Sequence, residues 1–276
     1  CQAANRAPDR APDPRPLYLL EFTGNAGRAE AASQHRPGWW GCRTLVIHRA
    51  NYPGYGGSSG PARLIEIPAA TLAAFDAVAK RAREQGAPLI VYGNSLGTTA
   101  ALYLASRREL DGVVLKNPVP LQDLVLRRFG WWNLWLGALP IALQIPHALN
   151  AMQTAARSKA PLVLVTSASD TLVPPRFLDE IFALYAGPKR RVIMPHAHHN
   201  SSLSGSRELV SALRWLVQTI DQQKRACRGL NLSRRAVADS GRPSLSLARQ
   251  ATIAWSSSAG RLETSSDGRG GAVCRW

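Results

Sequence analysis

Short apolar runs alternate with longer segments of helical periodicity along most of the chain. Six runs rich in Leu, Ile and Val cover residues 17–22, 44–48, 88–92, 113–116, 161–166 and 191–194. Most of them are continuously apolar, which is typical of strands buried on both faces of a parallel sheet. Between them, residues 68–85 and 206–221 repeat apolar side chains every three or four positions, as amphipathic helices do. This alternation predicts a doubly wound α/β fold with a mostly parallel sheet.

Three segments interrupt the alternation and suggest the domain organisation. Residues 1–16 hold four prolines and no apolar period, so we expect an extended lead-in. Residues 118–156 form a long insertion between the fourth and fifth predicted strands. Residues 226–276 are rich in Ser, Arg and Gly with almost no apolar periodicity, and we expect them to be a disordered basic tail. The folded domain is therefore predicted over residues 17–225.

The net charge of +16 first suggests a partner of negative charge, but its distribution weakens that idea. Residues 222–276 alone carry ten Lys or Arg against three Asp or Glu, which leaves +9 for the preceding residues. That remaining charge is spread along the sequence rather than clustered, as on a solvated surface. We therefore expect no nucleic-acid partner.

The four cysteines and the apolar runs exclude several other classes of protein. Cys1, Cys42, Cys227 and Cys274 form no C-x-x-C pair and have no metal-ligand spacing with histidine, which argues against a disulfide framework or a zinc site. No apolar run reaches the roughly 20 residues of a membrane span. We favour a cytoplasmic location; the alternative is a cell-envelope lipoprotein, if Cys1 is a processed N-terminus.

The segment GNSLG, residues 93–97, carries the strongest chemical signal. It fits G-x-S-x-G, and it lies where that motif needs to lie, after an apolar strand and before a helix predicted over residues 97–107. A sharp strand-to-helix turn requires neighbours without side chains and exposes the Ser95 hydroxyl at a helix N-terminus, where a developing anion is favoured. The alternative is an ordinary glycine-rich turn.

A serine hydroxyl becomes a useful nucleophile only when a base accepts its proton and a carboxylate orients that base. In this topology the acid and then the histidine should follow the serine, each just beyond a later strand. Asp170 follows the fifth predicted strand, and the sixth is followed by His196, His198 and His199. A loop aspartate or helix cap, and surface or metal-binding histidines, are the ordinary alternatives for each residue alone.

Taken together, these segments resemble the alpha/beta hydrolases, and in particular small serine hydrolases related to the serine aminopeptidase-like branch. The matching segments are TGNAG at 23–27, NYPGYGGSSG at 51–60, GNSLG at 93–97, SASDTLVPP at 167–175 and HHN at 198–200. The resemblance covers residues 17 to about 221. It implies that a hairpin which normally opens the sheet of this fold is missing here, because sixteen proline-rich residues cannot supply it.

The resemblance also implies a role for each candidate residue. It assigns Ser95 as the nucleophile, Asp170 as the orienting acid and His199 as the base, with backbone N–H groups of Asn25 and Leu96 forming an oxyanion hole. The motif alone leaves the choice between His198 and His199 open, although the asparagine that follows favours His199. No cofactor or metal is implied.

The insertion 118–156 contains Trp131, Trp132 and Trp135 and has three interpretations. We favour a small helical cap over the site that provides an apolar wall for an acyl group. Core packing is the second interpretation, and peripheral membrane contact is the third.

The sequence thus predicts a serine hydrolase that cleaves an ester, thioester or amide bond of a small molecule through an acyl-enzyme. A peptidase is a variant of this hypothesis. The rival from another class is a non-catalytic protein that binds membrane or nucleic acid through the basic tail and the Trp-rich cap. The substrate and the oligomeric state cannot be predicted from these residues.

Overall fold

The structure is a computed structural model that describes most of the chain. The described residues are 16–25, 27–31, 33–41, 44–129 and 136–240; for residues 128, 129 and 228–240 the description is limited to the backbone. The chain divides into two units, Cys1–Ile220 and Asp221–Trp276. The sheet and the candidate site belong to the first unit.

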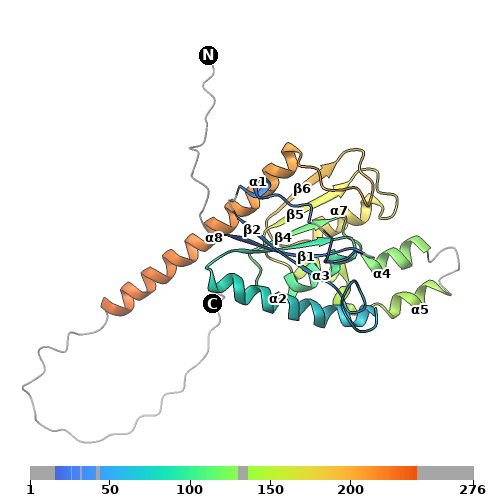
Figure 1. Ribbon diagram of the computed structural model, residues 1–276, viewed down its shortest axis with the longest axis horizontal. Coiled ribbons are helices and arrows are strands. Elements are labelled where there is room, and N and C mark those ends of the chain that lie inside the picture. Colours follow the sequence, from blue (N-terminus) through green and yellow to red (C-terminus); the bar gives the residue numbers. More distant parts are fainter. Residues whose placement is uncertain (1–15, 26, 32, 42–43, 130–135, 241–276) are drawn as a thin grey trace, which may run out of the picture. The chain divides into compact units, whose positions relative to one another are not determined.

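Six parallel strands form one sheet in the first unit (Figure 1). They are β1 (Leu17–Phe22), β2 (Leu45–Ala50), β3 (Leu89–Asn94), β4 (Gly112–Lys116), β5 (Leu162–Ser167) and β6 (Lys189–Met194). Their spatial order is β2-β1-β3-β4-β5-β6, and every neighbouring pair is parallel. All six apolar runs are therefore strands, and the predicted doubly wound α/β fold is confirmed.

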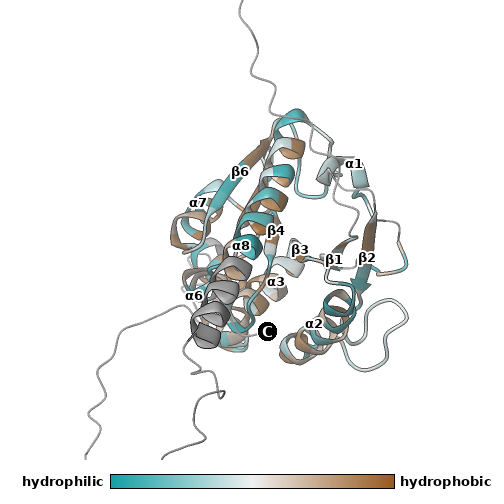
Figure 2. Cartoon of the chain, turned by 90° about the vertical axis from the view of Figure 1, so that its left-hand side faces the viewer, coloured by the Kyte–Doolittle hydropathy of each residue, from teal (hydrophilic) through white to brown (hydrophobic). Residues whose placement is uncertain are grey.

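Helices cover both faces of this sheet because its strands are apolar on both sides. They are α1 (Pro37–Trp40), α2 (Ile67–Glu84), α3 (Leu96–Arg107), α4 (Leu121–Leu124), α5 (Ala138–Leu143), α6 (Ala151–Arg157), α7 (Pro175–Leu184) and α8 (Arg207–Ser240). Three short helical segments complete the set: η1 (Leu64–Glu66), η2 (Val125–Phe129) and η4 (His147–Leu149). One core cluster packs α2, α3, α6 and α7 on one face of the sheet, and a second packs α1 and the first turns of α8 on the other. Figure 2 shows the hydrophilic and hydrophobic sides of α8.

Helix α8 corrects one expectation about the C-terminal segment. The helix continues to Ser240, so the predicted disorder is wrong for residues 226–240. Residues 222–240 are rich in Arg, Ala, Leu and Gln, which are strong helix formers; Gly229 is the single glycine among them, and Gly241 and Pro243 follow directly. The helix propensity of these residues thus explains why α8 continues through a segment with little apolar periodicity. Residues 241–276 lie outside the described part of the chain, as do residues 1–15.

The order of the strands places a crevice at one point of the sheet edge. The chain leaves β1 toward β2 on one side and then returns to form β3 on the other side of β1. In open parallel sheets, ligands bind beyond the carboxyl ends of the strands at such a switch point. The turn that follows β3 contains Ser95, and the loop that follows β1 contains Asn25.

Candidate active site

Ser95 occupies a sharp turn between β3 and α3. It has φ 50° and ψ −117°, a backbone conformation that non-glycine residues rarely adopt. A Cβ on Gly97 would lie 2.1 Å from the carbonyl oxygen of Phe22, and one on Gly93 would lie 2.5 Å from the carbonyl oxygen of Gly97. Only residues without side chains fit at these two positions, which explains the two glycines of the motif.

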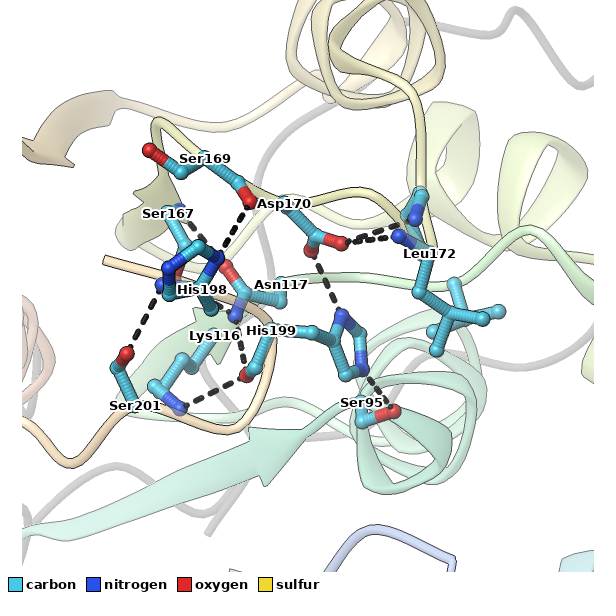
Figure 3. Close-up of polar contacts among 12 residues, drawn as sticks. Ser95, Lys116, Asn117, Ser167, Ser169, Asp170, Leu172, His198, His199 and Ser201 are labelled. Carbon is cyan, nitrogen blue, oxygen red and sulfur yellow. Dashed lines mark hydrogen bonds and ion pairs between the residues drawn. The ribbon is translucent and has the colours of Figure 1, made fainter. Parts of the chain in front are cut away.

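His199 lies between Ser95 and Asp170 (Figure 3). Its Nε2 is 2.7 Å from Ser95 Oγ, and its Nδ1 is 2.7 Å from Asp170 Oδ2. The other carboxylate oxygen, Oδ1, accepts hydrogen bonds from the backbone N–H groups of Leu172 and Val173, at 2.8 and 3.0 Å. Asp170 and His199 are 7% and 8% exposed, so the imidazole and the carboxylate that orients it are held largely out of water. The structure brings the three predicted side chains together in a chain of hydrogen bonds.

His198 and His196 point elsewhere. The Nδ1 of His198 donates to the carbonyl oxygen of Ser169 at 3.0 Å, and its side chain is exposed. His196 is exposed as well and has a positive φ of 57°. Of the two residues that the sequence left open as the base, His199 is the one that contacts both partners.

Asn117 and Lys116 hold the loop of His199, and sequence reasoning did not single them out. The side-chain amide of fully buried Asn117 donates to the carbonyl oxygen of His199 at 2.8 Å and to Ser167 Oγ at 2.9 Å. The ammonium of Lys116 donates more weakly to the same carbonyl, at 3.5 Å. Two polar residues directly after the apolar run VVL were the available signal, because they mark the carboxyl edge of the sheet.

The loop after β1 lies against Ser95. A Cβ on Gly24 would be 3.2 Å from the Cβ of Ser95, and the side chain of Asn25 is held by Tyr55, whose hydroxyl donates to Asn25 Oδ1 at 2.8 Å. Leu96 is the first residue of α3 and is buried. The two residues predicted to stabilise an oxyanion thus lie on the loop after β1, which reaches Ser95, and at the start of α3, directly after Ser95; that role remains a prediction.

A pocket of about 410 Å³ opens beside Ser95 and His199. Its walls come from the loop after β1, from the carboxyl halves of β1 to β4 and from the two loops near His199. Its charged lining residues are Glu21, Arg28, Arg49 and Lys116, with His35 beside them. A cavity of this size suits a small-molecule ligand, although its wall is more polar than that of a typical ligand pocket.

Glu21 is a buried carboxylate near the carboxyl end of the apolar strand β1. It pairs with Arg49, its register neighbour on β2, whose Nε lies 2.8 Å from Glu21 Oε2, and it also accepts a hydrogen bond from Ser33. Burial raises the pKa of Glu21, and the hydrogen bond from Ser33 and the charge of Arg49 oppose that rise. Burial, aided by Arg49, lowers the pKa of His35 to about 3. Glu21, Arg49, Ser33 and His35 thus connect β1, β2 and the loop that precedes α1. In the sequence, the charged Glu21 within the apolar run LYLLEF was the sign of this cluster.

The insertion 118–156 is helical, but its described residues do not line this pocket. Leu149, Ala151 and Ala155 are buried in the core cluster that contains α3. This part of the insertion packs as core, which was the second interpretation, and the expected wall over Ser95 stays a prediction. Trp131, Trp132 and Trp135 lie outside them.

The described residues hold neither a metal-binding cluster nor a membrane-spanning helix. They contain no group of three His, Cys, Asp or Glu side chains arranged to hold a metal ion. None of the described helices combines the length and the apolar character needed to cross a membrane.

Comparison with known proteins places this geometry in a known fold. No protein-family model matches the chain. An uncharacterized protein of Mycobacterium tuberculosis is 28% identical over 203 residues, which are 71% of this chain and 68% of that protein.

Solved structures give the fold. An esterase of Pyrococcus furiosus is similar with a TM-score of 0.55 and 16% identity, over 73% of this chain and 81% of the esterase. The alpha/beta hydrolase GrgF of Penicillium sp. sh18 is similar with a TM-score of 0.52 and 15% identity, over 76% of this chain and 91% of GrgF. At these identities the likeness extends to the fold and not to the substrate. The chain therefore has the alpha/beta hydrolase fold, as its sequence motifs predicted.

Proposed function

We propose that the protein is a serine hydrolase that cleaves an ester, thioester or amide bond through an acyl-enzyme intermediate. Ser95 is the nucleophile, His199 the general base and Asp170 the group that orients the base. The observation that carries this proposal is the position of His199, with one ring nitrogen 2.7 Å from Ser95 Oγ and the other 2.7 Å from Asp170 Oδ2. Each distance is within the range over which a proton can be transferred or held.

The hydrogen bonds determine which way the proton moves. A carboxylate accepts, so Nδ1 of His199 carries hydrogen and donates to Asp170, which leaves Nε2 free to accept the proton of Ser95. As Ser95 Oγ attacks the carbonyl carbon, Nε2 takes that proton, and Asp170 stabilises the imidazolium that forms. His199 then gives the proton to the leaving group. A water molecule activated by the same nitrogen hydrolyses the acyl-enzyme and restores the free serine.

The oxyanion of the tetrahedral intermediate needs donors that are already in place. The backbone N–H groups of Leu96 and Asn25 are the proposed donors, because Leu96 directly follows Ser95 and Asn25 lies on the loop that reaches Ser95. Leu96 is also the first residue of α3, where the helix dipole favours negative charge. The strained backbone of Ser95 is consistent with a nucleophile elbow.

An ester is the first substrate class to test. The fold is shared with an esterase, and a small pocket beside Ser95 suits a small-molecule ester better than an extended polypeptide. A thioester or amide would use the same chemistry with a different leaving group, so both remain within the proposal.

The experiment compares wild-type protein with Ser95→Ala on p-nitrophenyl acetate. We expect the wild type to hydrolyse it and the variant to lose several orders of magnitude in kcat, up to roughly a millionfold. Thermal unfolding of both proteins checks that the fold is retained. Equal activity of the two proteins would refute the proposal. Wild-type protein that binds anionic vesicles but hydrolyses no ester, thioester or amide would favour the non-catalytic alternative.

A further inference from the structure

Lys116 is a buried lysine on the wall of the pocket. It ends β4, it is 3% exposed, and it lines the pocket together with Ser95 and His199. Its backbone carbonyl accepts a hydrogen bond of 2.9 Å from the N–H of Ser95. The backbone of Lys116 thus supports the nucleophile, and Lys116 and Ser95 line the same pocket.

The ammonium has weak polar partners and no close counter-ion among the described residues. It donates to Asn94 Oδ1 at 3.3 Å and to the carbonyl oxygen of His199 at 3.5 Å, both long for a charged donor. Each acceptor is neutral, and no carboxylate of the described residues forms an ion pair with Lys116. Arg49, on the same pocket wall, has such a partner, since its Nε lies 2.8 Å from Glu21.

The charge of Asp170 acts on Lys116, but both oxygens of this carboxylate already have hydrogen-bond partners. Oδ2 bonds His199, and Oδ1 accepts two backbone N–H groups. Burial lowers the pKa of Lys116, and the charge of Asp170 raises it only in part. A buried charge without a close partner is unfavourable, and such groups are normally paired. The missing partner points to an anion that enters the pocket.

The other charges on the pocket wall reinforce this conclusion. Arg28, Arg49 and Lys116 contribute three cations, whereas Glu21 is the single carboxylate among the lining residues and is already paired with Arg49. The described lining therefore carries an excess of positive charge beside Ser95. A carboxylate is the anion that fits a hydrolase of small esters, since it adds charge without adding much volume.

We propose that the substrate carries a carboxylate close to the bond that is cleaved, and that Lys116 is its counter-ion in the pocket. This inference rests on the proposed function and narrows its substrate class to esters or thioesters with a free carboxylate. The carboxylate belongs either to the acyl part, as in a monoester of a dicarboxylic acid, or to the alcohol part. The contact with the His199 loop makes Lys116 a positioning residue as well as a specificity residue.

The test compares kcat/KM for an ester that carries a free carboxylate with kcat/KM for its methyl ester, in two pairs of esters. For the acyl side, 4-nitrophenyl hydrogen glutarate is compared with its methyl ester; for the alcohol side, 4-acetoxybenzoate is compared with methyl 4-acetoxybenzoate. Spontaneous hydrolysis is subtracted from each rate. In the wild type we expect kcat/KM to favour the free carboxylate at least about tenfold in one pair, and that pair identifies the side that carries the charge.

Lys116→Met then separates recognition of the charge from positioning. Because Lys116 also contacts the His199 loop, we expect both esters of the preferred pair to react more slowly, while the ratio between them falls to about one. A merely structural role would lower both rates equally and leave the ratio unchanged. Arg108→Met is the control for loss of a positive charge, since Arg108 is paired with Asp76 at the far end of α3 from Ser95, and it should keep the wild-type ratio.

Two results would overturn the inference. One is a wild-type preference for the methyl ester, or no preference, in both pairs, which needs no variant and is independent of any effect on folding. The other is an unchanged ratio in Lys116→Met. Failure of the wild type to hydrolyse any of the four esters, or p-nitrophenyl acetate, would instead count against the proposed function itself, and the inference would fall with it.

Discussion

The side-chain amide of Asn117 donates a hydrogen bond of 2.8 Å to the backbone carbonyl oxygen of His199. The same amide nitrogen donates to Ser167 Oγ, and the amide oxygen accepts from the backbone N–H of Ser167, each at 2.9 Å. Asn117 thus joins the ends of β4 and β5 to the loop that carries the proposed base. It does so from a positive φ of 48°, a conformation that asparagine tolerates better than most residues.

Asn117→Ala should therefore act on catalysis through the position of His199. We expect kcat to fall by about 10- to 100-fold with KM nearly unchanged, because a small misplacement of the base costs rate rather than binding. The free energy of unfolding should also fall by roughly 1–3 kcal/mol, because buried partners lose their hydrogen bonds. Steady-state kinetics and urea unfolding measure the two effects.

The control for Asn117→Ala is Asn150→Ala. Asn150 caps α6 and bonds Gln122, so its loss should lower stability while leaving kcat close to the wild-type value. A wild-type kcat in Asn117→Ala would show that the hydrogen bond to His199 does not position the base.

The two neighbouring histidines should differ strongly in their effect on activity. His199→Ala removes the group that contacts both Ser95 and Asp170, and we expect a loss comparable to that of Ser95→Ala because nucleophile and base act as one unit. His198→Ala removes only an exposed contact to the carbonyl oxygen of Ser169, so kcat should fall by less than about tenfold. The measurement is kcat for p-nitrophenyl acetate, and the opposite order of the two variants would assign the base to His198.

Gly97→Ala tests the close packing beneath the nucleophile. The new Cβ would lie 2.1 Å from the carbonyl oxygen of Phe22, so β1 and α3 would have to move apart. Forced overpacking of this kind costs about 1–3 kcal/mol, and the loop after β1 should shift with it, lowering activity as well as melting temperature.

Gly38→Ala is the matched control for this substitution. A Cβ at Gly38, which is in helix α1, would point into open space, so the melting temperature should stay the same or rise slightly. If Gly97→Ala melts like the wild type, β3, α3 and the end of β1 are not as closely packed as described.

Burial of His35 predicts an acid-dependent loss of stability. Its pKa falls from 6.5 to about 3 on folding. Between these two pH values His35 is protonated in the unfolded chain and neutral in the folded protein. The stability from His35 is complete above pH 6.5 and is lost as the pH falls toward 3, by up to about 4 kcal/mol. Glu21 has the opposite effect on stability. Burial raises its pKa, so the free energy of unfolding falls as the pH rises above 4.5.

His35→Phe isolates the contribution of this histidine. The ring still packs edge-on against Tyr92 but no longer titrates, and Glu21 is present in both proteins. As the pH falls from 7 to 4, the free energy of unfolding of the wild type should decrease relative to that of the variant. Parallel stability curves over that range would contradict the assigned burial of His35.

The sequence predicted the strands, and it pointed to the candidate residues at their ends, because both are local signals. Continuous apolar runs predict buried strands. The glycines around Ser95 indicate a turn too tight for side chains at those positions. The sequence favoured His199 over His198 only through the asparagine that follows, since one residue of loop register decides which ring reaches Asp170. The pairing of Glu21 with Arg49 and the role of Lys116 were beyond the sequence, because they depend on neighbouring strands that lie far apart in the chain.

The insertion shows what composition alone cannot decide. Apolar residues in 118–156 fit a wall over Ser95 as well as they fit core packing, and the two differ only in tertiary contacts. Ala151 and Ala155 are small enough to let α6 approach α3 closely, which was a sign of helix packing rather than of a cap.

Labelling with a fluorophosphonate, followed by peptide mass spectrometry, tests the central claim most directly. The reagent reacts with a serine whose hydroxyl is activated by a base and whose product oxyanion is stabilised, so it reports the proposed machinery without any knowledge of the substrate. We expect one phosphonylated residue, Ser95, in the wild type, no label in Ser95→Ala, and strongly slowed labelling in His199→Ala. Failure of the folded wild-type protein to be labelled, or equal labelling of Ser95→Ala, would contradict the assignment of Ser95 as an activated nucleophile.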